Sequence, residues 1–102
     1  MKRIYVCAPL GKNIPSDLQN ARQYASFVLQ RGAAPVVPHF YVDLVDRDER
    51  ALCRRAGKTL LWMCDECWVF GDHVTRTMKE ELQFCKHLNI KIRYFTGGTK
   101  RD

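Results

Sequence analysis

Short apolar runs alternate with longer segments of helical periodicity along this chain. Residues 4–8 form a β-branched and aromatic run that ends before Pro9 and Gly11, as a buried strand does. A helix is expected next, with Ser16 as its N-cap and Gly32 at its end. Its apolar positions recur at helical spacing: Leu18, Ala21, Ala25, Val28 and Leu29. The start of the chain therefore predicts a strand, a loop and a helix.

The next stretch repeats this pattern. Residues 33–37 predict a second strand, whose pairing is weakened by Pro35, and residues 38–41 leave it as an aromatic loop. A second helix is expected to start at Asp46 or Asp48 and to run to residues 64–65. Its apolar positions are Leu52, Ala56, Leu60 and Met63.

The last third of the chain adds two strands and a helix. Residues 67–70 predict a third strand that ends at residues 71–72, residues 78–88 a third helix, and residues 90–95 a fourth strand. We expect one domain over residues 1–96, followed by a flexible tail at residues 97–102.

Strands that alternate with helices at this spacing predict a parallel sheet, because parallel neighbours need long crossover connections. The predicted fold is α/β: a three-layer Rossmann-like (flavodoxin-like) fold with a parallel sheet of about four strands flanked by helices. Ligands of such sheets bind beyond the carboxyl ends of the strands. Those ends carry residues 8–13, 38–43 and 71–77.

The composition fits one domain with one core. The chain has 102 residues, of which 46% are hydrophobic. It contains no apolar run of the roughly 20 residues that a membrane span needs, and no apolar block of the signal-peptide kind at its start. Five cysteines make an odd count, which fits reduced thiols. We therefore expect a soluble, cytoplasmic protein without a membrane partner.

The net charge of +6 comes from 17 basic and 11 acidic residues. The basic residues are scattered, and they form neither a basic helix face nor an RNA-binding aromatic motif. This balance suits a phosphate-bearing small molecule at least as well as a nucleic acid. Binding to DNA or RNA rests on net charge alone, and it would show a strong dependence on salt.

One carboxylate falls on the apolar side of the third predicted helix. On a helical wheel Glu81 lies between Cys85 and Leu88, whereas Glu80 points about 100° further round, towards solvent. A carboxylate on a buried face is costly unless it is paired, protonated or turned into a ligand cleft. Thr77 and Glu80 form a capping-box pattern, which places Glu81 about one turn into the helix. A structural Glu81 that caps a loop or pairs with an arginine is the alternative.

The chain resembles the nucleoside 2-deoxyribosyltransferase and nucleotide N-glycosidase superfamily over about residues 2–95. The features that carry the resemblance are residues 4–9, a helix ending in Gly32, Val37-Pro38, Cys64-Asp65 before a strand, and Glu81-Leu82-x-x-Cys85. The resemblance implies that the protein binds a nucleoside or nucleotide and that Glu81 attacks the anomeric carbon of the sugar. A glycosyl-enzyme then forms, which water or another base resolves. No metal or organic cofactor is implied.

The resemblance also implies roles for residues around Glu81. Tyr5 matches a tyrosine that hydrogen-bonds the nucleophile, although it is also an ordinary strand residue. Thr75 stands where monophosphate-cleaving relatives carry a phosphate-binding serine, although it would also suit a helix cap. Thr77 replaces a glycine that usually precedes the nucleophile. The loop after the first strand is expected to hold sugar or phosphate through Ala8, Pro9, Gly11 and Lys12.

The chain departs from the family at the position of the catalytic acid. Relatives carry that acid on the second helix, eight residues before Asp65, where this chain has Gly57. His39, Asp43 and Asp72 are the candidate substitutes, because each lies on a loop at the expected ligand edge. Asp65 itself is expected to serve the start of the third strand.

Gly57 at the position of the acid, and Gln83-Phe84 where relatives carry small residues, leave a second hypothesis open. It is a non-catalytic nucleotide-binding or sensor module with the same fold. A metal site at Cys64-x-x-Cys67 is not supported, because no second pair stands at ligand spacing. We also expect a homo-oligomer, a dimer or larger, because the chain carries more aromatic surface than a monomer of 102 residues easily hides: Trp62, Trp68, Phe84 and Tyr94.

Overall fold

Four parallel strands form the centre of the computed structural model, which describes residues 1–11 and 13–96. In chain order the elements are β1 (Arg3–Cys7), α1 (Ile14–Gln30), β2 (Ala34–Val36), η1 (Pro38–Leu44), η2 (Arg47–Glu49), α2 (Arg50–Trp62), β3 (Glu66–Gly71), α3 (Arg76–His87) and β4 (Lys91–Thr96). The sheet order is β2-β1-β3-β4, and all neighbours are parallel. The predicted α/β class and four-stranded parallel sheet are confirmed.

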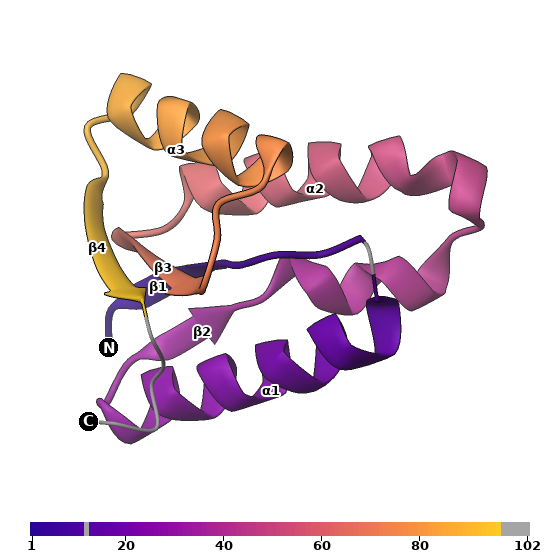
Figure 1. The fold of residues 1–102 in the computed structure, drawn as a ribbon. Coiled ribbons are helices and arrows are strands. Elements are labelled where there is room, and N and C mark those ends of the chain that lie inside the picture. Colours follow the sequence, from indigo (N-terminus) through magenta and orange to yellow (C-terminus); the bar gives the residue numbers. More distant parts are fainter. Residues whose placement is uncertain (12, 97–102) are drawn as a thin grey trace.

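Helices cover both faces of this sheet, α1 on one side and α2 with α3 on the other (Figure 1). Successive residues of β1 point to opposite faces. Ile4 and Val6 belong to the apolar cluster that includes Val28 of α1. Tyr5 belongs to a second cluster that includes Leu61 of α2. Because both faces are covered, residues 4–7 of β1 form an unbroken apolar run.

The first helix begins earlier than expected. Asn13, and not Ser16, is the N-cap of α1, and the Asn13 Oδ1 accepts a hydrogen bond from the Ser16 backbone N–H at 3.2 Å. Pro15 occupies the first turn, where a missing N–H costs nothing. At the other end Gly32 takes a φ of +79°, as expected for a residue that ends a helix. Leu29 was expected in the buried face but is exposed.

The buried face of α2 differs from the predicted one. Residues 47–49 form a separate 3-10 turn, and the helix proper begins at Arg50. Leu52 and Met63 are about half exposed, whereas Gly57 and Leu61 are buried. The predicted face was therefore wrong, because the buried positions lie about one residue further along the helix than expected. The physical reason is that Gly57 faces the sheet, where its missing side chain admits Tyr5.

Residues 38–44 form the 3-10 helix η1 in place of the expected open loop. This turn buries His39 and Val42 at the carboxyl end of the sheet. None of the described helices is long and apolar enough to cross a membrane. All five cysteines, each within the described part of the chain, carry free thiols.

The aromatic residues divide between core and surface. Trp68, which we expected to contribute to the surface, is buried between Phe27 and Phe95, and Phe84 is partly buried. Trp62 and Tyr94 remain 67% and 58% exposed. The predicted tail at residues 97–102 lies outside the described residues.

Candidate active site

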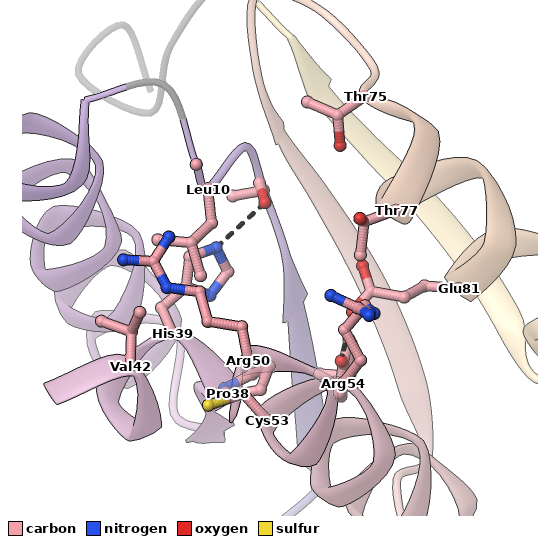
Figure 2. Close-up of a pocket in the computed structure, with 13 residues that line it drawn as sticks. Leu10, Pro38, His39, Val42, Arg50, Cys53, Arg54, Thr75, Thr77 and Glu81 are labelled. Atoms are coloured by element: carbon pink, nitrogen blue, oxygen red, sulfur yellow. Dashed lines mark hydrogen bonds between the residues drawn. The ribbon is translucent and has the colours of Figure 1, made fainter. Parts of the chain in front are cut away.

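A pocket opens at the carboxyl ends of the strands, where the fold predicts a ligand site. It holds a cavity of about 100 Å³ that opens to solvent. One side is formed by α3 and the turn before it, with Thr75, Thr77 and Glu81 (Figure 2). Across the pocket Figure 2 shows Leu10 and Arg50, with His39 beneath them.

Glu81 is held by two side chains of β1. The Tyr5 hydroxyl donates to Glu81 Oε2 at 2.5 Å, and the Cys7 thiol donates to Oε1 at 3.4 Å. Each carboxylate oxygen therefore has its own donor, which fixes the orientation of the carboxylate. The resemblance implied the contact with Tyr5, whereas the sequence pattern did not indicate the contact with Cys7.

Burial disfavours the charged form of Glu81 and raises the pKa of its carboxyl group, although the hydrogen bonds from Tyr5 and Cys7 act in the opposite direction. The pKa of the Tyr5 hydroxyl is also raised, first by burial and then by the adjacent Glu81. Tyr5 therefore stays protonated and remains a hydrogen-bond donor to Glu81.

The strand and the helix explain why these groups meet. Tyr5 and Cys7 are two residues apart on β1, so their side chains point to the same face. On α3, Glu81 lies on the sheet-facing side between Met78 and Cys85, as the helical wheel predicted. A carboxylate on this face meets the hydroxyl and the thiol of β1 where the pocket opens.

The N-cap of α3 is Thr75, so the predicted capping box of Thr77 and Glu80 is wrong. The Thr75 Oγ1 accepts a hydrogen bond from the Met78 backbone N–H at 3.2 Å. The helix starts two residues earlier than the pattern suggested, because Thr75 takes the extended backbone of an N-cap residue. Both threonines line the pocket, and the Thr75 hydroxyl proton remains available to a ligand.

The loop after β1 contributes Ala8 and Gly11 to the pocket. Pro9 lines an adjoining hollow, which it shares with Gly11 and the two threonines of the α3 rim. Lys12, the expected source of positive charge in this loop, lies outside the described residues.

His39 lines the pocket and is only 4% exposed. Its Nε2 lies 2.9 Å from the Ala8 carbonyl oxygen (Figure 2). Because a carbonyl only accepts, Nε2 carries the proton and Nδ1 is left as an acceptor without a partner. Burial lowers the pKa of His39. The ring is therefore neutral and has no spare proton for a leaving group.

The two acidic candidates do not line the pocket. Asp72 is exposed, and its carboxylate pairs with His73 at 2.7 Å. Asp43 is also exposed on η1. Neither is placed to replace the acid that is missing at Gly57.

Sequence reasoning missed the two arginines that α2 places in the pocket. Arg50 and Arg54 both line it, and the Arg50 Nε is buried without a hydrogen-bond partner. Neither guanidinium forms an ion pair with a carboxylate of residues 1–11 or 13–96. Their spacing of four residues places them on one face of a helix, which is the signal that could have identified them.

Gly57 of α2 lies beside the Tyr5 hydroxyl, which binds Glu81. A Cβ at this position would come within 3.0 Å of the Tyr5 hydroxyl oxygen and 3.4 Å of the Pro38 Cβ. A side chain at residue 57 would therefore crowd the tyrosine that binds Glu81.

The cysteine pair and Asp65 have structural surroundings. The Cys64 thiol donates to the Leu60 carbonyl at 3.3 Å, and Cys67 is buried in β3. Asp65 accepts a hydrogen bond from the Arg3 backbone N–H at 2.7 Å, which agrees with its expected place at the strand start. Within the described part of the chain, no group of three His, Cys, Asp or Glu residues could hold a metal ion.

Residues 2–95 match a protein family described as a domain of unknown function, DUF7768. The chain belongs to the DUF7768 family. No curated protein matches this DUF7768 chain.

Solved structures share the fold of the DUF7768 chain. One is a 2-deoxyribosyltransferase from Bacillus psychrosaccharolyticus, with a TM-score of 0.71 and 16% identity over 92% of this chain and 72% of the other. Another is the CMP N-glycosidase BcmB of Clostridium botulinum, with a TM-score of 0.57 and 11% identity over 97% and 92% of the two chains. At the level of the fold, the resemblance inferred from the sequence is confirmed.

Proposed function

We propose that this DUF7768 protein cleaves or transfers the N-glycosidic bond of a nucleoside or a nucleoside 5′-monophosphate, with Glu81 as the nucleophile. The observation that carries the proposal is the Glu81 carboxylate in the pocket, bound by the Tyr5 hydroxyl at 2.5 Å and the Cys7 thiol at 3.4 Å. The fold shared with a 2-deoxyribosyltransferase and a CMP N-glycosidase supports this class of substrate.

In the first step a Glu81 oxygen forms a bond to the anomeric carbon, and the bond from that carbon to the base breaks. The electron pair of the broken bond leaves with the base. Water, or a second base, then attacks the same carbon and releases the Glu81 carboxylate. Tyr5 is the positioning residue, because its hydroxyl holds one carboxylate oxygen.

Ionised Glu81 is required for this attack, so its raised pKa sets the acid side of the pH profile. The rim offers groups for the rest of the substrate. Thr75 and Thr77 with Gly11 are our candidates for contacts to sugar or phosphate, because they surround the opening above Glu81. The proposed reaction uses no cofactor.

The test is release of base from a panel of nucleosides and their 5′-monophosphates, measured by chromatography. The parent should release base from at least one substrate, and Glu81→Gln should reduce the rate by at least about 10³-fold, since it removes the nucleophile. Glu80→Gln is the matched control, because Glu80 is the exposed neighbour on α3. It should retain the parent's rate. Equal rates in the parent and Glu81→Gln would refute the role of Glu81.

A second candidate function is a nucleotide-binding or sensor module without catalysis. The absence of a carboxyl side chain at Gly57 favours it, together with the exposed positions of Asp43 and Asp72. This function predicts that a nucleotide raises the melting temperature while no base is released.

We also propose that the protein assembles as a dimer or larger oligomer. Trp62 is two-thirds exposed, and with Met63 and Phe84 it lines an open hollow formed by residues of α2 and α3. An exposed apolar hollow of this kind is typical of an interface between subunits.

A further inference from the structure

The pocket receives positive charge, rather than an acid, from α2. Arg50 and Arg54 come from α2, whereas Glu81 comes from α3. Arg50 lies across the pocket from Glu81 and Thr77 (Figure 2). The Arg50 Nε is buried without a hydrogen-bond partner, so a ligand that brought an anion to it would satisfy a group that is otherwise costly to bury.

Among the residues that the structure describes, the α2 and η1 side of the pocket has no carboxyl group to protonate a departing base, and the Cys53 thiol there donates to the Tyr41 carbonyl at 3.6 Å. Gly57 has no side chain, and the Tyr5 hydroxyl fills the space beside it. His39 donates its Nε2 proton to the Ala8 carbonyl, so its Nδ1 can only accept. An arginine does not give up its proton in a protein. The electron pair that passes to the base must therefore be stabilised by charge.

We propose that Arg50 and Arg54 form a subsite for negative charge on the base of the substrate. The inference rests on the proposed function, because a nucleophile at Glu81 expels the base towards the opposite side of the pocket. The bond between the anomeric carbon and the base nitrogen breaks, and the base leaves as an anion beside the guanidinium groups. The base later takes a proton from water. The substrate class is nucleotides whose base carries an acidic substituent or develops negative charge as it leaves.

The first experiment measures binding and needs no turnover. Calorimetry on Glu81→Gln protein compares uridine 5′-monophosphate with its 6-carboxylate, and uridine with its own 6-carboxylate. A charge-assisted contact should make each carboxylate bind roughly 10- to 100-fold more tightly. This advantage should fall to near unity in Arg50→Gln/Arg54→Gln. It should persist in Arg55→Gln, a control on the same helix whose exposed side chain does not line the pocket.

The second experiment tests charge that develops during the reaction. It uses proteins that keep the wild-type Glu81. The double arginine variant should release guanine from guanosine 5′-monophosphate roughly 10- to 100-fold more slowly than the parent. It should release 7-methylguanine from the 7-methyl nucleotide at the parent's rate, because that base departs as a neutral molecule. A carboxylate advantage that depends on the arginines supports an acidic substituent. If the arginine variant slows release of guanine but not of 7-methylguanine, and the carboxylates have no binding advantage, the result supports negative charge that develops on the leaving base.

The inference is overturned if the double arginine variant keeps the tighter binding of the carboxylates and also releases guanine at the parent's rate. It is also overturned if they lose the advantage of uridine 5′-monophosphate over uridine, because the arginines would then bind the 5′-phosphate. Failure of the proposed function is a separate result, in which no nucleotide of the panel loses its base in the parent. Circular dichroism and the melting temperature establish that each variant is folded.

Discussion

Glu81 shows how far a single residue can be predicted from its neighbours. The helical wheel placed its carboxylate on the apolar face of α3, and the structure places it there with donors from Tyr5 and Cys7. Local periodicity could predict the face, but not the hydrogen bond to Cys7, which joins residues 74 positions apart. Arg50 was missed for a similar reason, because its buried Nε becomes evident only when η1 and α2 are packed together.

The raised pKa of Glu81 predicts a change of stability with pH. Because burial raises the folded-state pKa above the ordinary value of about 4.3, the protonated carboxyl favours the folded state. This contribution is complete below the unfolded-state pKa and is lost as pH rises through the folded-state pKa. Glu81→Gln removes the ionisation, so the variant should be more stable than the parent at neutral pH, by roughly 0.5–2 kcal/mol.

Urea unfolding between about pH 4 and pH 8 measures this difference. The stability gap between Glu81→Gln and the parent should widen as pH rises. Glu80→Gln should follow the parent across the range, since Glu80 is exposed. A gap that stays constant with pH would show that the Glu81 pKa is not raised by folding.

At the scale of elements, strand and helix identities were easier to predict than their ends and faces. Every expected strand and helix is present, because each has its own period of apolar residues. The caps at Asn13 and Thr75 were misjudged, since several polar residues near each helix start could fill that role. The face of α2 was misjudged because apolar residues were assumed to be buried, whereas Gly57 is buried to admit Tyr5.

Gly57 gives a prediction about the packing of α2 on β1. Alanine at a helix interior normally gains about 1 kcal/mol over glycine. Here its Cβ would lie 3.0 Å from the Tyr5 hydroxyl oxygen, and overpacking of a core costs roughly 1–3 kcal/mol. We expect Gly57→Ala to be no more stable than the parent and to release base at least about tenfold more slowly, because Tyr5 is displaced from Glu81.

Ala51→Gly is the matched control, because Ala51 is an exposed residue of the same helix. It should lower stability by at most about 1 kcal/mol, because Ala51 lies in the first turn of α2, and it should leave the rate of base release unchanged. Denaturant unfolding and base release are measured on both variants. A Gly57→Ala protein that is stabilised and fully active would contradict the packing described for Tyr5.

At the scale of the whole molecule, alternation of strands and helices was sufficient to predict a parallel sheet with helices on both faces. The sheet order β2-β1-β3-β4 places β1 and β3 at the centre, and their carboxyl ends lead to the two rims of the pocket. Surface aromatics were harder to predict. Trp68 lies in the core beside Phe95, a contact that depends on the pairing of β3 with β4.

The exposed hollow around Trp62 predicts self-association. The parent should sediment as a dimer or larger at micromolar concentration. Trp62→Ser should shift the protein towards the monomer, because it removes a large aromatic side chain from the proposed interface. Leu29→Ser, which changes an exposed apolar residue of α1, is the control and should not alter the sedimentation. A parent that sediments as a monomer would contradict this proposal.

The central claim is that Glu81 forms a covalent bond to the sugar. The most direct measurement is the mass of the protein after incubation with 2′-deoxy-2′-fluoro nucleosides and their 5′-monophosphates, since fluorine at this position slows breakdown of a glycosyl-enzyme. We predict a mass increase equal to the fluorinated glycosyl group, with or without its 5′-phosphate. It should be located on the peptide that contains Glu81 and be absent from Glu81→Gln. Base release without any adduct, continuing unchanged in Glu81→Gln, would contradict the account.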